Sequence, residues 1–108
     1  MGDLWSYPFG ENSLVLTEGE GNGDRLFELD ARDIVLFRGR PEATSARNLL
    51  SCKVVDIFRF NNRVGVELDC RGMRLVAQIV PESVLELGIE KGVEVVAVIK
   101  ASSFRRVV

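Results

Sequence analysis

Apolar and polar residues alternate most regularly between residues 52 and 79, and this alternation predicts consecutive β-strands. In the middle of this stretch, glycine or an acidic residue separates four apolar residues: Val64, Val66, Leu68 and Cys70. A period of two is typical of a strand with one buried face. Asn61-Asn62 and Arg71-Gly72 interrupt the pattern with residues that favour tight turns. We therefore predict a three-stranded meander with strands at 52–60, 63–70 and 73–79.

The two-residue turn also predicts the strand register, and with it the relation between the two cysteines. In this register Phe60 faces Arg63, Phe58 faces Gly65 and Lys53 faces Cys70. Since side chains alternate along a strand, Cys52 and Cys70 are expected on opposite faces of the sheet. No disulfide forms between them in this register, and we expect Cys70 to fill the core.

The period changes after the third strand. Pro81 at the start, Glu82 in the first turn and Gly88 just past the end predict one short helix. Three apolar residues of this helix are expected to cover one end of the sheet: Val84, Leu85 and Leu87. Residues 93–100 are apolar at nearly every position, which predicts a strand buried on both faces. Residues 104–108 predict a last short strand.

The first part of the chain has weaker patterns. Residues 14–17 predict a short strand, and residues 18–24 combine glycines with polar residues as a plain loop does. Residues 25–30 and 33–38 have strand-type composition on either side of a tight turn. We interpret these segments as parts of an N-terminal arm.

Three strands, a helix and further strands follow one another as in the five-stranded barrel of the oligonucleotide- and oligosaccharide-binding (OB) fold. A generic small barrel or sandwich also fits this order. We expect an all-β protein: a five-stranded OB-like barrel with one short helix in residues 45–108. Residues 1–44 are expected to form an arm with short strands.

Composition excludes several classes of function. The chain of 108 residues has no histidine and a formal net charge of −2. Without histidine the most usual general base is missing, and the two cysteines lack the spacing of a zinc site. We therefore expect no enzyme, no metal and no cofactor. No apolar stretch approaches the length of a membrane span, so a cytoplasmic location is the default.

Two polar stretches, Thr44–Leu50 and Lys100–Ser103, flank the regular part of the chain. A doubly charged oxyanion needs only donors, namely cationic side chains, hydroxyls and backbone N–H groups. Among the residues of these stretches we single out five donors: Ser45, Arg47, Asn48, Lys100 and Ser102. We predict that the two stretches meet in space and hold a small tetrahedral oxyanion. The alternative is that the two cations are solvated strand ends and the serines are turn residues.

A different alternative is binding of single-stranded nucleic acid, which OB modules achieve with stacked aromatics in basic grooves. Phe58, Arg59, Phe60 and Arg63 form a small aromatic and basic cluster on one predicted hairpin. The other interpretation of this cluster is that Phe58 packs over Gly65 and Phe60 joins an oligomer contact. Because the net charge gives no electrostatic footprint for nucleic acid, we expect none to bind.

Three separated motifs resemble the signature of the Mop family of molybdate- and tungstate-binding modules, also called TOBE domains. The motifs are Ser45-Ala46-Arg47-Asn48, Pro81-Glu82-Ser83-Val84 with Leu87-Gly88, and Ile99-Lys100-Ala101-Ser102-Ser103. The resemblance covers about Ser45 to Val107. Upstream, residues 31–45 are similar to the segment that precedes this module in molybdate transporter ATPases.

This resemblance implies an OB-like barrel that holds the oxyanion at interfaces between copies of the module. The implied oxyanion-binding residues are Ser45, Ala46 (through its backbone amide), Arg47, Asn48, Ser83, Lys100, Ala101 and Ser102. The chain departs from the family at Val80, where members that bind well often carry threonine. A methyl in place of that hydroxyl removes one hydrogen bond, which typically costs about 0.5–1.5 kcal/mol.

From the resemblance we interpret the chain as an accessory, regulatory domain of a molybdate ABC-transporter ATPase, since it carries no nucleotide-binding loop of its own. The alternative is a stand-alone molbindin that stores molybdate. Expected partners are molybdate or tungstate and other copies of the domain, in a homodimer or a larger assembly. If the chain is a transporter domain, its expected partners also include ATPase and membrane subunits, which would bring the chain to the membrane. Selectivity among molybdate, tungstate and sulfate depends on cavity size, which the sequence does not indicate.

Overall fold

The structure is a computed structural model that describes residues 5–9, 12–16 and 27–107. The strands of this part are β1 Trp5–Phe9, β2 Asn12–Leu16, β3 Phe27–Leu29, β4 Val35–Phe37, β5 Asn48–Phe60, β6 Arg63–Cys70, β7 Met73–Ile79, β8 Glu94–Ile99 and β9 Phe104–Arg106. They are accompanied by the helix α1 Pro81–Leu87 and the 3-10 turns η1 Ala31–Asp33 and η2 Ala101–Ser103. No helix among the described residues is long and apolar enough to cross a membrane.

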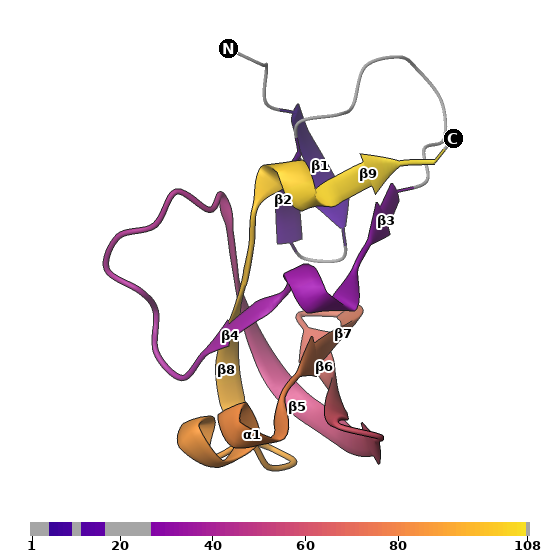
Figure 1. The fold of residues 1–108 in the computed structure, drawn as a ribbon. Helices are drawn as coiled ribbons and strands as arrows, with labels where there is room; N and C mark the ends of the chain where they lie inside the picture. The colour runs from indigo at the N-terminus through magenta and orange to yellow at the C-terminus, as the bar shows by residue number, and fades with distance from the viewer. Residues whose placement is uncertain (1–4, 10–11, 17–26, 108) are drawn as a thin grey trace.

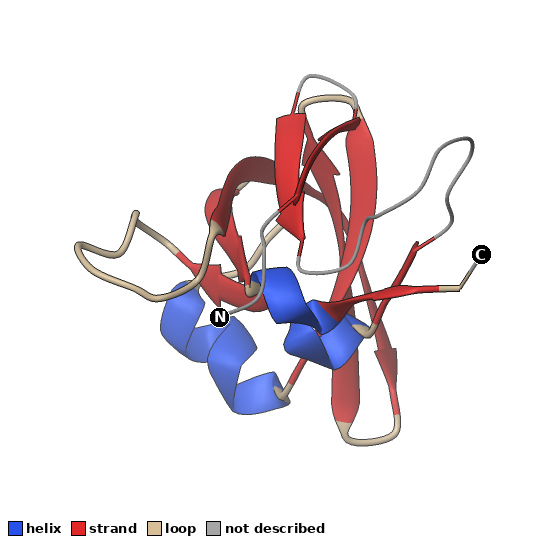
Figure 2. Cartoon of the chain, turned by 90° about the horizontal axis from the view of Figure 1, so that it is seen from above, coloured by secondary structure: helices blue, strands red, loops and turns tan. Residues whose placement is uncertain are grey.

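A five-stranded antiparallel sheet with the order β4-β8-β5-β6-β7 forms the centre of the molecule (Figure 1). β1 pairs with β2, and β3 pairs with β9, in two smaller sheets. Seen from above, α1 and the two 3-10 turns lie toward one side of the strands (Figure 2). The long strand β5 pairs with β8 through its first half and with β6 through its second half. This arrangement confirms the predicted all-β class with one helix.

The regular part of the chain forms the elements that its pattern predicts. β6 and β7 have the predicted ends, and β5 begins earlier than predicted, at Asn48. Gly88 ends α1 in the left-handed conformation with φ of 62°, where glycine meets no steric penalty. Val84 is buried and Leu87 is partly buried, as expected, but Leu85 is 82% exposed and covers nothing. The helix is short, so it buries one narrow face only.

Two predicted strands upstream of residue 44 join the sheets of the later part. β4 pairs with β8, and β3 pairs with β9. Between them lies η1, where a tight turn was predicted, and η1 contacts β7. β2 occurs where residues 14–17 predict a strand. The predicted loop at 18–24 lies outside the described residues.

The central sheet has a buried face and an outer face. Residues in the middle of the strands, such as Val66, Leu68 and Ala77, are fully buried and form the core. On the outer face, large apolar residues of several strands stay exposed: Val35, Phe37, Phe58, Phe60 and Val76. The outer face is therefore the one available to ligands and partners.

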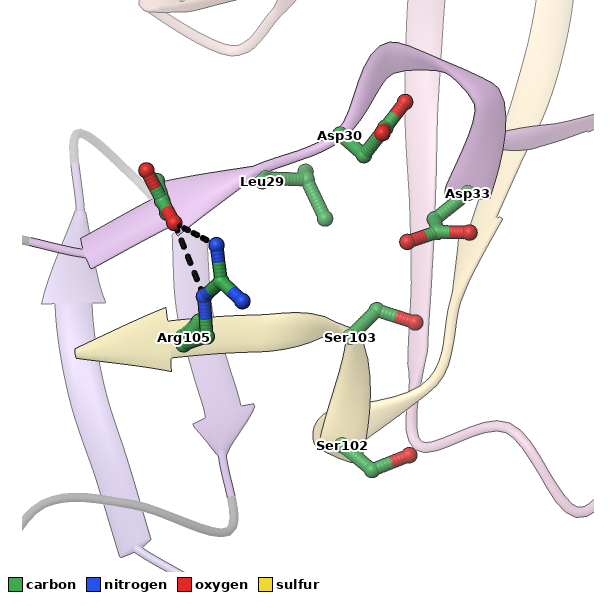
Figure 3. A pocket seen from close by; sticks show the side chains of 7 residues that line it. Leu29, Asp30, Asp33, Ser102, Ser103 and Arg105 are labelled. Carbon is green, nitrogen blue, oxygen red and sulfur yellow. Dashed lines mark hydrogen bonds and ion pairs between the residues drawn. The ribbon is translucent and has the colours of Figure 1, made fainter.

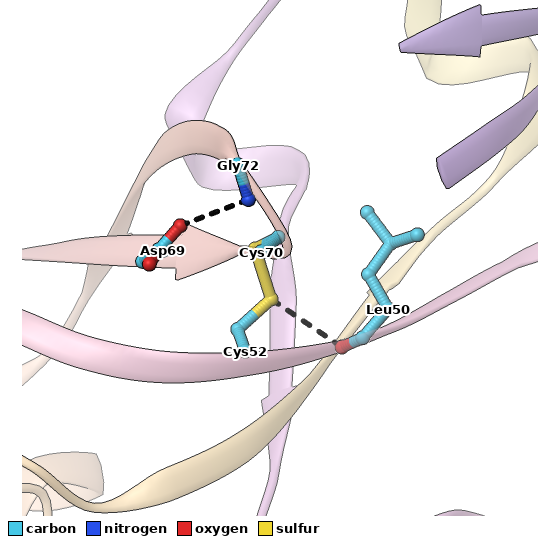
Figure 4. The surroundings of a disulfide bond; sticks show 5 residues. All are labelled: Leu50, Cys52, Asp69, Cys70 and Gly72. Atoms are coloured by element: carbon cyan, nitrogen blue, oxygen red, sulfur yellow. Dashed lines mark hydrogen bonds between the residues drawn. A yellow bond between two sulfur atoms is a disulfide. The ribbon is translucent and has the colours of Figure 1, made fainter. Parts of the chain in front are cut away.

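The structure contradicts the prediction that the cysteines cannot bond. Cys52 and Cys70 form a disulfide, with Cα atoms 4.2 Å apart (Figure 4). The predicted register is confirmed near the turn, where Phe58 faces Gly65, but Lys53 faces Asp69 instead of Cys70.

A β-bulge in β5 causes this difference. The register with β6 shifts between Val54 and Asp56, so Val55 is an additional residue on β5. At the same point the N–H of Val54 donates to the carbonyl of Val93 at 2.9 Å, and the Val54 carbonyl accepts from Gly92 at 2.8 Å. β5 thus ends its pairing with the β8 side here and continues along β6, and a bulge provides the bend. The additional residue moves Cys52 to the same face as its partner.

Candidate functional site

Pairing between β5 and β8 brings together the two polar stretches that the sequence singles out. Asn48 faces Ile99 at the end of the ladder. The Asn48 side chain is 2% exposed, and its Nδ2 donates to the carbonyl of Ile99 at 3.2 Å. A buried amide needs such partners, because an unpaired polar group in the core is costly. Asn48 therefore ties the two stretches together.

Arg47 and Lys100 are the next residues beyond this last pair, and continuing the register by one residue would set them opposite each other. Side chains of directly opposite residues lie on the same face of the sheet and close to one another. Both side chains are exposed, and neither forms an ion pair within the described part of the chain. Two neighbouring positive charges repel each other, and a bound anion would remove that repulsion.

A hollow of about 350 Å³ lies beside Lys100 on the outer face. It is lined by Arg32, Asp33, Val35, Phe37, Thr44, Ala46, Val98, Lys100 and Ser103. Two of the predicted site residues, Ala46 and Lys100, are in this set. Thr44 and Ser103 belong to the two polar stretches but were not predicted as binding residues. Arg32 was missed because η1 is distant in sequence and reaches the hollow only through the fold.

The backbone amide of Ala46 already has a partner. Its N–H donates to Oγ1 of Thr44 at 3.1 Å. Hydroxyl groups of threonine often satisfy backbone donors two residues on in this way. An oxyanion that uses the Ala46 amide must therefore replace this hydroxyl, or accept from both groups at once. Ser45 between them is exposed.

Ser102 lines a different hollow, of about 520 Å³, which shares Asp33 and Ser103 with the first (Figure 3). Its lining includes the carboxylates of Glu28, Asp30 and Asp33. Hydrogen bonds from the Arg32 side chain and backbone lower the pKa of Asp30 to about 2, so this carboxylate is charged near neutral pH. Negative charge of this kind disfavours an oxyanion, although Arg105 pairs with one of the carboxylates, that of Glu28.

The remaining predicted residues lie elsewhere. Ala101 is buried in η2, so only its backbone can contribute. Ser83 is in α1, which lies at one end of β8, whereas η2 follows the other end (Figure 1). A strand of the length of β8 spans about 20 Å. One chain therefore does not bring Ser83 to Lys100.

Val80 stands just before α1 as its N-cap residue. Its side chain makes no capping hydrogen bond and is 49% exposed. The described residues also contain no group of three or more histidine, cysteine or acidic side chains that could hold a metal ion. The predicted binding residues thus offer hydrogen-bond donation and positive charge, whereas Asp33 adds a carboxylate to the hollow beside Lys100.

Comparison with protein families matches residues 44–105, more than half of the chain, to the TOBE domain. Among curated proteins, the chain is 39% identical over 83 residues to the molybdenum import ATP-binding protein ModC of Photorhabdus laumondii, covering 77% of this chain and 23% of the relative. It is 46% identical over 77 residues to ModC of Brucella abortus, covering 70% of this chain and 21% of the relative. The chain thus spans less than a quarter of the length of these relatives.

Two of three similar solved structures are described as molybdate-binding proteins. ModG, described as a cytoplasmic molybdate-binding protein with molybdate bound, matches with a TM-score of 0.82 at 24% identity, covering 92% of this chain and 78% of that chain. A molybdate-binding protein from Sporomusa ovata matches with a TM-score of 0.52 at 34% identity, covering 55% of this chain and 88% of that chain. MopII from Clostridium pasteurianum matches with a TM-score of 0.50 at 37% identity, covering 55% of this chain and 90% of that chain. The first match confirms the predicted fold.

Proposed function

This chain belongs to the TOBE domain family, and on that premise we propose that it binds molybdate as a small oxyanion-binding domain. Proteins that share its fold are binding proteins, and the chain covers only the small domain, so we assign it no catalytic activity. The names of the ModC relatives refer to molybdenum, and the description of the Sporomusa ovata structure refers to molybdate. Tungstate, which has the same charge and tetrahedral shape, is expected to compete for the same donors.

The observation that carries the proposal is the β5–β8 ladder, which ends immediately beside Arg47 on one segment and Lys100 on the other. The ladder between β5 and β8 ends at Asn48 and Ile99, one residue before this pair of cations. The nearby hydroxyls of Thr44 and Ser103 line the hollow next to the lysine and can orient the oxygens of an anion. We assign the charge of the site to the two cations, and its remaining donors to Ser45, the Ala46 amide and Ser102.

Ser83 enters the proposal through a second copy of the chain. Within one chain it lies at the end of β8 away from Lys100. We propose that a complete site combines Arg47 and Lys100 of one copy with Ser83 of another, in a homodimer or a larger assembly. The position of Val80 next to α1 supports a weakened site, because a methyl stands where a hydroxyl could have donated.

For the role of the protein we favour a stand-alone molybdate-binding protein in the cytoplasm. This role is supported by the match to a molybdate-binding protein from Sporomusa ovata, which is 34% identical and is covered over 88% of its length. The accessory, regulatory domain of a molybdate transporter ATPase is the second candidate, favoured by the 46% identity to ModC of Brucella abortus. In that role the chain would act beside ATPase and membrane subunits.

Calorimetric titration with molybdate tests the assignment. We expect Arg47→Ala and Lys100→Ala each to raise the Kd by about tenfold to a hundredfold, because each removes a charge-assisted hydrogen bond. Arg59→Ala is the matched control, since Arg59 is also an exposed cation without an ion pair in the described part. If the parent chain and the three variants have the same Kd, the assignment of the site to Arg47 and Lys100 is wrong. If the parent chain gives no heat, the proposed molybdate binding is wrong.

A further inference from the structure

Four cationic side chains gather around another hollow on the outer face. This hollow of about 450 Å³ lies between the connector that follows β4 and the strands β5, β6 and β8. Its cations are Arg38, Arg40, Lys53 and Arg71. The chain as a whole has a net charge of −2, so the cluster does not reflect a basic composition. None of its lining residues lines the hollow beside Lys100.

None of these four cations forms an ion pair with a carboxylate in the described part of the chain. Elsewhere in the described part, four cationic residues form ion pairs with carboxylates: Arg32, Arg74, Lys91 and Arg105. Among the same described residues, the cations of the hollow form none: Arg38, Arg40, Lys53 and Arg71. The charges of Arg40 and Arg71 are therefore available to a ligand.

The fold holds the cluster in place from two sides. Nη1 of Arg38 donates to the carbonyl of Leu87 at 2.7 Å and anchors the start of the connector to the end of α1. Lys53 lies opposite Glu94 on one side and Asp69 on the other, so its charge is balanced by two acids of the hollow. The positive charges of Arg40 in the connector and Arg71 in the β6–β7 turn are not balanced in this way.

We propose that this hollow binds a small polyanion of the diphosphate or triphosphate class between the guanidinium groups of Arg40 and Arg71. Guanidinium groups donate two parallel hydrogen bonds to phosphate, which fixes its orientation. The hydroxyl of Ser51, which also lines the hollow, is a further donor. The volume is in the range of small-ligand pockets and admits more than one phosphate group. This site is separate from the molybdate site and does not depend on it.

Calorimetric titration with inorganic pyrophosphate at low ionic strength tests this site, because salt screens exposed charges. We expect the parent chain to bind and R40Q/R71Q to bind at least about tenfold more weakly, since two charge-assisted contacts are lost. R59Q/R63Q is the matched control: it removes the same charge at the tip of the β5–β6 hairpin, away from the hollow. Amide NMR spectra of both variants establish that the fold is intact.

Four outcomes would overturn the proposal. No heat with the parent chain, or unchanged binding by R40Q/R71Q, means that the hollow is not a polyanion site. An equal loss in R59Q/R63Q means that only the total charge matters. Lys100→Ala must leave pyrophosphate binding unchanged, because a loss would show that pyrophosphate occupies the molybdate site. Conversely, R40Q/R71Q is expected to bind molybdate as the parent chain does, whichever result pyrophosphate gives.

Discussion

Gly65 lies under the ring of Phe58 on the outer face of the sheet. A Cβ atom on Gly65 would be 2.2 Å from Cε2 of that ring, so the position has no room for a side chain. The ring also stacks on Phe60, with centroids 6.2 Å apart. The interpretation that Phe58 packs over the glycine is confirmed, and the glycine is required by space and not by its backbone angles.

We expect Gly65→Ala to lower the free energy of unfolding by about 1–3 kcal/mol, because the methyl forces the exposed ring away from β6. Urea denaturation followed by circular dichroism measures this change. In a Phe58→Ala background the ring is gone, and the same substitution should then cost nothing or stabilise slightly, since alanine loses less backbone entropy than glycine. An equal cost in both backgrounds would refute the steric explanation.

Asn48 illustrates the limit of residue type as evidence. Its amide was predicted to donate to an oxyanion, and the structure shows it donating to the carbonyl of Ile99 from a buried position. The sequence indicates correctly that this amide needs an acceptor. Which acceptor it finds depends on the register of two strands about fifty residues apart in the chain.

At the scale of elements, the bulge in β5 decides the relation between the cysteines. Before Val55 the strand is in one register with β6, and after it in another. Beside the disulfide, Sγ of Cys52 lies 3.4 Å from the carbonyl oxygen of Leu50, which could accept a hydrogen bond from a free thiol (Figure 4). The disulfide joins β5 to β6, two strands that are already paired by backbone hydrogen bonds.

We expect Cys52→Ala/Cys70→Ala to lose about 3 kcal/mol of unfolding free energy, because the bond closes a loop of 18 residues in the unfolded chain. Denaturation with and without dithiothreitol measures the effect. The reductant should destabilise the parent chain and leave the double variant unchanged. Two thiols that react with Ellman's reagent in the unreduced native protein would contradict the bond.

At the scale of the whole molecule, the distance between Ser83 and Lys100 has a consequence for assembly. If the molybdate site is shared between copies, light scattering should give at least twice the chain mass of 12.0 kDa. If the protein is a monomer under conditions in which it binds molybdate tightly, the site is not shared between copies.

Mixing variants makes this prediction sharper. Ser83→Ala and Lys100→Ala each damage every site in their own homodimers. After denaturation and refolding of an equal mixture, half of the dimers are mixed and each has one intact site, so about a quarter of the sites should recover. No recovery, with dimers present, would place both residues of each site in one chain.

Local pattern determined the elements from Arg63 to Gly88, and it identified the polar stretches at Thr44–Leu50 and Lys100–Ser103. This was possible because strand alternation, turn residues and helix ends act over a few neighbouring residues. The motifs in the same stretches were also enough to predict the TOBE family, which the comparison confirms. The binding roles of their residues remain predictions.

Only the tertiary structure decided the bulge at Val55, the disulfide, the pairing of β4 with β8, and the contribution of Arg32 to the hollow beside Lys100. A bulge adds one residue without changing composition, so no period in the sequence reveals it. The other features join segments far apart in the chain. Their positions depend on the register and packing of the whole sheet, which local preferences do not specify.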